Sequence, residues 1–131
     1  MNPFENTLHE VTEIARNFAQ FYYGLYNDVN KRAQLQSLYT DQSCFTMQNS
    51  TFSGQQQIMS KLMDEGMLSN MKACTNFIAQ PSVPGTILIS VQGETMFQGE
   101  ENTLAFLEIF LIGQVQGSFV ILNQIFSTHG V

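Results

Sequence analysis

Asn17-Phe18-Ala19-Gln20-Phe21-Tyr22-Tyr23 lies in the middle of a long amphipathic segment. Apolar side chains recur every three or four residues around it, at Phe4, Leu8, Val11, Ala15, Phe18, Tyr22 and Leu25. This period predicts one helix over residues 3–26, and Asn2-Pro3-Phe4-Glu5 has the residue types of a helix start. Ile14 and Phe21 widen the apolar stripe, so we expect the helix to lie across a sheet, which is broad enough to cover it.

Downstream of this helix the chain changes from short helices to long strands. A turn over 27–30 and a short helix over 31–39 precede Ser43-Cys44-Phe45-Thr46-Met47, which begins a predicted hairpin with Thr51 and Phe52. Ser53-Gly54-Gln55-Gln56 has capping-box spacing and predicts a helix that ends at Gly66. The remainder predicts four strands, over 72–80, from 87 through Gly93, over 104–114 and over 119–126, and residues 87–92 alternate with the period of two of a half-covered sheet.

These elements together predict an α+β fold. A long N-terminal helix and two shorter helices pack in a strongly bent, mixed or antiparallel sheet that forms a cone. Gly93 falls within a predicted strand and suggests a bulge or bend there. We expect residues 1–131 to form a single domain, because a chain of this length can bury one substantial core.

The predicted strand over 104–112 is apolar on both faces. Phe106 and Phe110 share one face, and Leu107, Ile109 and Leu111 share the other. One face can pack on the long helix, and the other needs a second cover. A second copy of the sheet is the simplest cover, so we expect a homodimer with Leu107 and Ile109 in its interface. Burial beneath a loop is the alternative.

Composition narrows the classes of function. The net charge is −6, and all five basic residues lie before position 73, which disfavours nucleic-acid binding. The acidic balance fits either a plain solvated surface or an acidic rim that steers a basic protein partner. No apolar run reaches the ~18–20 residues of a membrane span, and the N-terminus lacks the basic region of a signal peptide.

The two cysteines, Cys44 and Cys74, are expected to be reduced, small apolar residues within strands. No Cys or His spacing indicates a metal site, so we predict neither a metal nor another cofactor.

In order and spacing, residues 4–128 resemble the nuclear transport factor 2 family. The matching segments are Asn17–Tyr23, Gln34–Tyr39, Ser43–Thr46, Ser53-Gly54, Ile58, Lys61-Leu62, Gln80-Pro81, Ile87–Gly93, Phe106, Phe110-Leu111 and Asn123–Phe126. The resemblance implies a cystatin-like cone that dimerises and carries the small GTPase Ran, in its GDP form, into the nucleus. It also implies weak binding to phenylalanine-glycine repeats of nuclear pore proteins, with a location in the cytoplasm, the nucleus and the nuclear pore.

The resemblance further implies partner-binding positions, several of which hold different residue types here. The family's Ran-binding aromatic residue and Glu correspond to Met47 and Gln48; Met can still line an apolar pocket, whereas Gln loses the ion pair. The family's acidic run corresponds to Glu100 and Glu101. The helix aromatic that binds phenylalanine-glycine repeats corresponds to Val11.

Two alternatives stay open within the same fold. The strand Gly93-Glu94-Thr95-Met96-Phe97-Gln98-Gly99 looks like that of the small subunit of an mRNA export heterodimer. The cone fold also hosts small-molecule-binding members and enzymes, such as ketosteroid isomerases and dehydratases, which need a carboxylate or His inside the cavity. We predict no catalytic residue, because Asp41, Glu94 and Glu108 are expected on outer faces or beside polar residues. His9 and His129 lie on the helix's polar side and at the tail.

Overall fold

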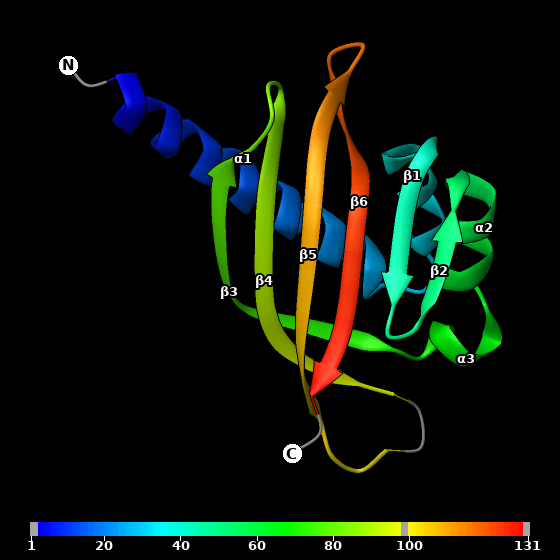
Figure 1. The fold of residues 1–131 in the computed structure, drawn as a ribbon. Helices are drawn as coiled ribbons and strands as arrows, with labels where there is room; N and C mark the ends of the chain where they lie inside the picture. Colours follow the sequence, from blue (N-terminus) through cyan, green and yellow to red (C-terminus); the bar gives the residue numbers. More distant parts are fainter. Residues whose placement is uncertain (1–2, 98–99, 130–131) are drawn as a thin grey trace.

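The computed structural model describes residues 3–97 and 100–129, which form a curled sheet wrapped on one long helix (Figure 1). The elements are, in order, α1 (Pro3–Tyr26), η1 (Arg32–Leu38), β1 (Tyr39–Met47), β2 (Ser50–Ser53), α2 (Gly54–Leu62), α3 (Glu65–Leu68), β3 (Met71–Pro81), β4 (Thr86–Met96), β5 (Leu104–Val115) and β6 (Ser118–His129). The strand order is β2-β1-β6-β5-β4-β3. Only the β1–β6 pairing in this sheet is parallel, so the predicted α+β class with a mixed sheet is confirmed.

α1 has the predicted bounds and lies behind the strands in Figure 1, across the inner face of the sheet. Ala15 and Tyr22 are fully buried, and the rings of Phe18 and Tyr22 meet the ring of Phe110 on β5 at centroid distances of 5.1 and 5.0 Å. One part of the predicted stripe is wrong, because Phe21 is 53% exposed on the solvent side of the helix. The predicted cap, Asn2, lies outside the described residues.

The short helices differ from the prediction in detail. The segment after the first turn is a 3-10 helix, η1, and the helix that begins at Gly54 ends at Leu62 instead of Gly66. Gly66 lies inside a further short helix, α3, that the sequence did not predict. The Ser53 cap also differs: its backbone N–H donates to the side chain of Gln57, at 3.0 Å, and not to that of Gln56.

A buried cation explains why the chain folds tightly around these short helices. The guanidinium of Arg32 is fully buried and donates to the backbone carbonyls of Tyr26, Leu62, Met67 and Asn70 at 2.5–3.3 Å. These carbonyls lie at the C-terminal ends of α1, α2 and α3 and just before β3, where backbone acceptors lack helical partners. Arg32 therefore joins four segments through one side chain.

The sheet bends where Gly93 faces β3. A Cβ atom at Gly93 would lie 2.0 Å from the carbonyl oxygen of Ala73 and 2.7 Å from the ring of Phe106, so only glycine fits there. The β3–β4 register shifts between Cys74 and Asn76, beside this close approach. The predicted irregularity at Gly93 is therefore confirmed, and its extra residue, Thr75, is on the neighbouring strand.

Candidate functional site

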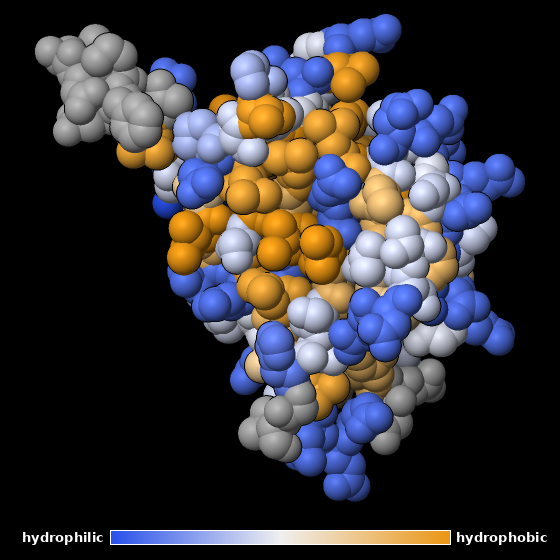
Figure 2. All heavy atoms as spheres, in the orientation of Figure 1, coloured by the Kyte–Doolittle hydropathy of each residue, from blue (hydrophilic) through white to orange (hydrophobic). Residues whose placement is uncertain are grey.

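The outer face of the sheet carries the two residues predicted for a dimer interface. Strand register places Ile109 in a row with Ile78, Ser90 and Ile125, and Leu107 lies two residues away on the same face. Ile78 and Ile125 are 65% and 48% exposed, and Leu107 and Ile109 are half-buried. Figure 2 shows hydrophobic side chains gathered across this face of the molecule. We call this surface the outer apolar face.

The four residues implied for Ran binding lie at one end of the sheet. Met47 ends β1, is half-buried, and pairs with Phe126 of β6. Gln48 adopts a positive φ of 54° in the hairpin turn, and its side-chain nitrogen donates to Thr128 Oγ1 at 2.6 Å. Glu100 and Glu101 are exposed in the segment between β4 and β5, which enters the sheet at this same end (Figure 1).

Val11 lines a surface cavity of about 370 Å³ at the opposite end of the sheet. Its side chain is buried in α1, and the other apolar walls come from Pro81, Pro84, Ile87 and Phe119. An aromatic ring is therefore present in this slot, contributed by β6 instead of the helix.

The cone interior holds a buried ion pair that the sequence analysis missed. Both carboxylate oxygens of Glu108 lie 3.1–3.2 Å from Lys72 Nζ, and the two side chains are at most 1% exposed. The Tyr23 hydroxyl donates to Glu108 Oε1 at 2.8 Å, and Gln124 Nε2 donates to Oε2 at 2.8 Å. The prediction that no carboxylate lies deep in the cone is therefore wrong.

The signal for this carboxylate was present in the alternation of β5. Glu108 lies between Phe106 and Phe110, so a period of two places it on the same inner face as these rings. No comparable pattern points to its partners Lys72, Gln124 and Tyr23, which come from β3, β6 and α1.

Burial shapes the electrostatics of this cluster. The ammonium of Lys72 lies 4.3 Å from the ring centroid of Tyr26 and 4.1 Å from that of Phe126, so two aromatic faces and Glu108 surround it. Burial lowers the pKa of Lys72, and the charge of Glu108 opposes that shift. Burial also raises the pKa of Tyr22 and Tyr23 well above the usual value of a phenol.

The cluster continues through hydrogen-bonded tyrosines. Tyr39 donates to Gln124 Oε1 at 2.6 Å, and Gln124 Nε2 lies 3.0 Å from the hydroxyl of Tyr22. Each polar atom of Glu108 and Gln124 thus has a protein partner. This arrangement fixes the inner face of the sheet against α1 and leaves no carboxylate oxygen free.

Both cysteines are free and lie within strands, as predicted. Cys44 on β1 is half-buried, and Cys74 on β3 is exposed. In the described part of the chain, no group of three or more His, Cys, Asp or Glu could hold a metal ion. None of the helices described here is long and apolar enough to cross a membrane.

Comparison with solved structures shows which fold class this chain adopts. A structure of nuclear transport factor 2 from Cryptosporidium parvum superposes with a TM-score of 0.81 at 26% identity, covering 92% of this chain and 95% of that one. A candidate scytalone dehydratase from Novosphingobium aromaticivorans, at 14% identity, a TM-score of 0.73 and coverage of 94% of this chain and 87% of that one, shares the fold alone. The class is thus the cone-shaped α+β fold, which also includes a chain named for an enzyme.

Sequence similarity assigns the chain to one family within this fold class. The family model described as the nuclear transport factor 2 domain matches residues 14–128. Nuclear transport factor 2 from Saccharomyces cerevisiae is 31% identical over 114 residues, which cover 86% of this chain and 90% of the relative. The chain belongs to the nuclear transport factor 2 family, as its resemblance predicted.

Proposed function

We propose that this protein is a nuclear transport factor that carries a GDP-bound, Ran-type small GTPase into the nucleus. The observation that carries the proposal is the match to nuclear transport factor 2 from Saccharomyces cerevisiae over 86% of the chain. In this proposal residues 1–131 act as one domain, without catalysis or cofactor. The protein acts in the cytoplasm, the nucleus and the nuclear pore.

The GTPase docks at the end of the sheet that carries Met47 and Gln48. An apolar anchor of the GTPase packs on Met47, whose flexible thioether adapts to it. Glu100 and Glu101 are exposed carboxylates at that end, and they attract a basic partner surface and raise its association rate. Gln48 holds the hairpin turn to β6 through Thr128 and keeps Met47 in place.

Calorimetry with Ran loaded with GDP or with GTP tests this proposal. We expect binding of the GDP form alone, its loss in Met47→Lys, and slower, less salt-sensitive association in the double variant Glu100→Gln, Glu101→Gln. Val29→Lys, an exposed substitution in the turn after α1, is the matched control for Met47→Lys. Absence of binding to GDP-loaded Ran at low salt would reject the transport function and favour the mRNA-export alternative.

Phenylalanine-glycine repeats bind weakly at the cavity beside Val11. A cavity of about 370 Å³ with walls from two prolines and Phe119 suits one phenyl ring. A repeat peptide titrated into labelled protein should shift the NMR signals of Val11 and Phe119. Phe119→Ala should weaken binding by about 0.5–1.5 kcal/mol, the worth of an aromatic pair, and Phe52→Ala should not.

The outer apolar face supports a homodimer. Its central row of Ile78, Ser90, Ile109 and Ile125 contains no charge, and an exposed apolar sheet face of this kind is typical of interaction surfaces. Sedimentation velocity at micromolar concentration tests the assembly. A stable monomer would reject the homodimer and leave a larger relative as the partner.

A carboxylate inside the cone does not make this protein an enzyme. Glu108 accepts hydrogen bonds from Lys72, Tyr23 and Gln124 and is fully buried, so neither oxygen can take a proton from a substrate. A general base needs such an approach. NMR observation of candidate ketosteroid substrates tests the absence of catalysis. We expect their α-protons to exchange no faster with the protein than in buffer alone.

A further inference from the structure

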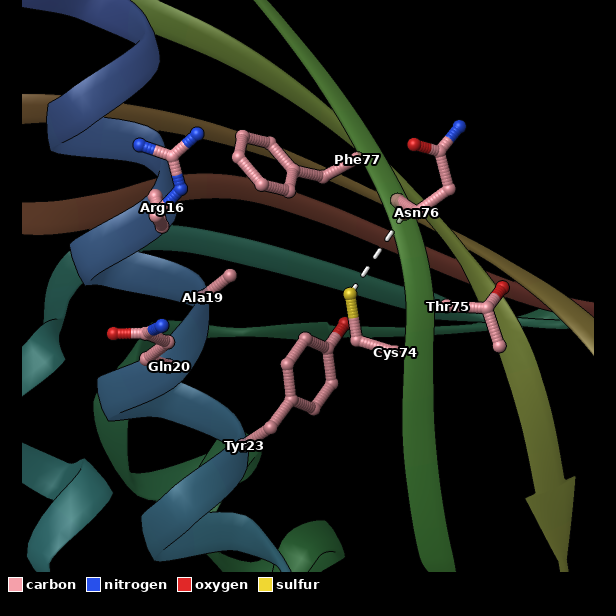
Figure 3. A pocket seen from close by; sticks show the side chains of 8 residues that line it. All are labelled: Arg16, Ala19, Gln20, Tyr23, Cys74, Thr75, Asn76 and Phe77. Carbon is pink, nitrogen blue, oxygen red and sulfur yellow. Dashed lines mark hydrogen bonds between the residues drawn. The ribbon is translucent and has the colours of Figure 1, made fainter.

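A second cavity, of about 390 Å³, lies between α1 and β3 on the inner side of the sheet edge (Figure 3). The side chains that face it are those of Arg16, Ala19, Tyr23, Cys74 and Phe77, and Gln20, Thr75 and Asn76 complete the lining. Its volume falls within the range of ~300–1,000 Å³ typical of small-molecule sites. None of the surfaces in the proposed transport function includes these residues, so the cavity has no role there.

The irregularity of β3 keeps this cavity open. The register shift beside Thr75 lets that residue and Asn76 point away from the helix, whereas Cys74 and Phe77 point toward it (Figure 3). On the helix side Ala19 presents only a methyl group. Because the cavity is on the inner side of β3, a partner packed on the outer apolar face would leave it accessible.

The two ends of the cavity differ in chemistry. At one end Arg16 reaches across to Phe77, with its guanidinium carbon 5.7 Å from the ring centroid. Arg16 also forms an exposed ion pair with Glu13, which is not a lining residue. At the other end are the ring of Tyr23 and the thiol of Cys74, and the Tyr23 hydroxyl is already bonded to Glu108.

Arg16 is the one charged side chain among the eight lining residues. Its planar guanidinium has five N–H donors, so the bond to Glu13 leaves donors for a second acceptor. The other lining residues are uncharged, and Ala19, Tyr23 and Phe77 provide apolar surface. A ligand matched to these walls has one negative group at the Arg16 end and an apolar body.

We propose that this cavity binds a small organic monoanion, whose carboxylate pairs with Arg16 and whose apolar body lies against Ala19, Tyr23 and Phe77. A short aromatic or alkyl carboxylate has this chemistry. The site is separate from the GTPase, repeat and dimer surfaces, so its test is independent of theirs.

Cys74 provides a reporter for the test. The chain has two cysteines, so Cys44→Ser leaves Cys74 as the one thiol. Alkylation by neutral iodoacetamide at pH 8.5, followed by mass spectrometry, measures access to the cavity. We expect 4-phenylbutyrate at millimolar concentration to slow alkylation of Cys74, and the uncharged 4-phenylbutanol to bind up to about fivefold more weakly, the range of a partly exposed ion pair.

Two variants and a control sharpen this result. Arg16→Gln should reduce the affinity for 4-phenylbutyrate to that of the alcohol, and Ala19→Leu should abolish binding of both by filling the cavity. Lys61→Gln is the matched control, because Lys61 also packs over a ring, that of Phe52 at 5.9 Å, outside the cavity. Unchanged alkylation with saturating 4-phenylbutyrate, or equal losses in Arg16→Gln and Lys61→Gln, would overturn the proposal.

Discussion

The inner and outer faces of the sheet each carry an exception to the usual distribution of polarity, within an inner face that is otherwise apolar. The inner face buries Lys72, Glu108 and Gln124 against α1, whereas the outer face exposes Ile78 and Ile125. A half-covered sheet ordinarily turns apolar side chains inward and polar ones to water. The polar residues of the inner face are tolerated because they are paired and hydrogen-bonded, and the exposed apolar residues of the outer face fit the proposed dimer.

The largest expected loss of stability comes from raising the pH, because ionised tyrosines would place negative charges on the buried inner side of the sheet. The chain has four tyrosines, Tyr22, Tyr23, Tyr26 and Tyr39, all buried, and burial raises the pKa of each. Their contribution to stability is therefore full below pH 10, the unfolded pKa, and is lost as the pH rises above it. The loss is about 1.4 kcal/mol per tyrosine per pH unit, or about 6 kcal/mol for the four tyrosines by pH 11.

Absorbance at 295 nm, recorded with circular dichroism, measures this effect. Phenolate should appear only together with global unfolding, in one cooperative step for all four tyrosines. Phenolate signal from a tyrosine while the fold remains intact would contradict the closed, protonated inner face.

The next effect follows from breaking the buried ion pair. Glu108→Leu leaves Lys72 as an unpaired buried charge and should lower the free energy of unfolding by about 3–5 kcal/mol in urea. Adding Lys72→Met removes that charge and should recover more than half of the loss. The experiments need one fixed protein concentration, since the proposed dimerisation would add to apparent stability. If the double variant is no more stable than Glu108→Leu, the unpaired charge of Lys72 is not the cause of the loss of stability.

A charge on the outer face should act on assembly instead of folding. Ile109→Glu places a carboxylate in the middle of the outer apolar face and should raise the dimer dissociation constant about a hundredfold, near 2.7 kcal/mol. Its monomer should unfold at a similar urea concentration, because Ile109 is only half-buried within the chain. Val29→Glu, at an exposed position away from the sheet, is the control for sedimentation. An unchanged dimer in Ile109→Glu would remove the interface from this face.

The smallest expected effect extends the outer apolar face. Ser90 is the polar member of the row that contains Ile78, Ile109 and Ile125. Ser90→Val makes the row fully apolar and should tighten the dimer by up to about tenfold, as expected for burying one further small apolar side chain. Analytical ultracentrifugation over a dilution series measures the change. A weaker dimer would indicate that the Ser90 hydroxyl has a polar partner across the interface.

Much of the fold could be predicted because helix and strand periods are local. A period of 3.6 set the bounds of α1, and a period of two placed Leu107 and Ile109 opposite Phe106 and Phe110. The same reasoning failed at Phe21, where a neighbour in sequence widened the stripe on paper but faces solvent in the fold. It also missed α3, whose four residues are too few for a period and whose carbonyl at Met67 is bound by Arg32.

For the candidate binding surfaces, too, the sequence identified individual residues but not the surroundings that the fold places around them. The resemblance selected Val11, and the cavity walls that complete its slot come from segments about 70 to 110 residues further along the chain. Met47 and Gln48 were expected at a pocket mouth. In the structure Met47 packs against the core and pairs with Phe126, whose ring contacts Lys72, the ion-pair partner of Glu108.

The order of residue types along the chain was enough to predict the helix, the strands, their two faces and the family. The partners of Glu108 inside the cone follow from the packing of distant segments, which that order does not contain. Glu108 is 36 residues from Lys72 and 85 from Tyr23, and they meet because β3, β4 and β5 pair while α1 crosses their inner face. A buried charge is tolerated only where such distant partners converge, and no local pattern records that convergence.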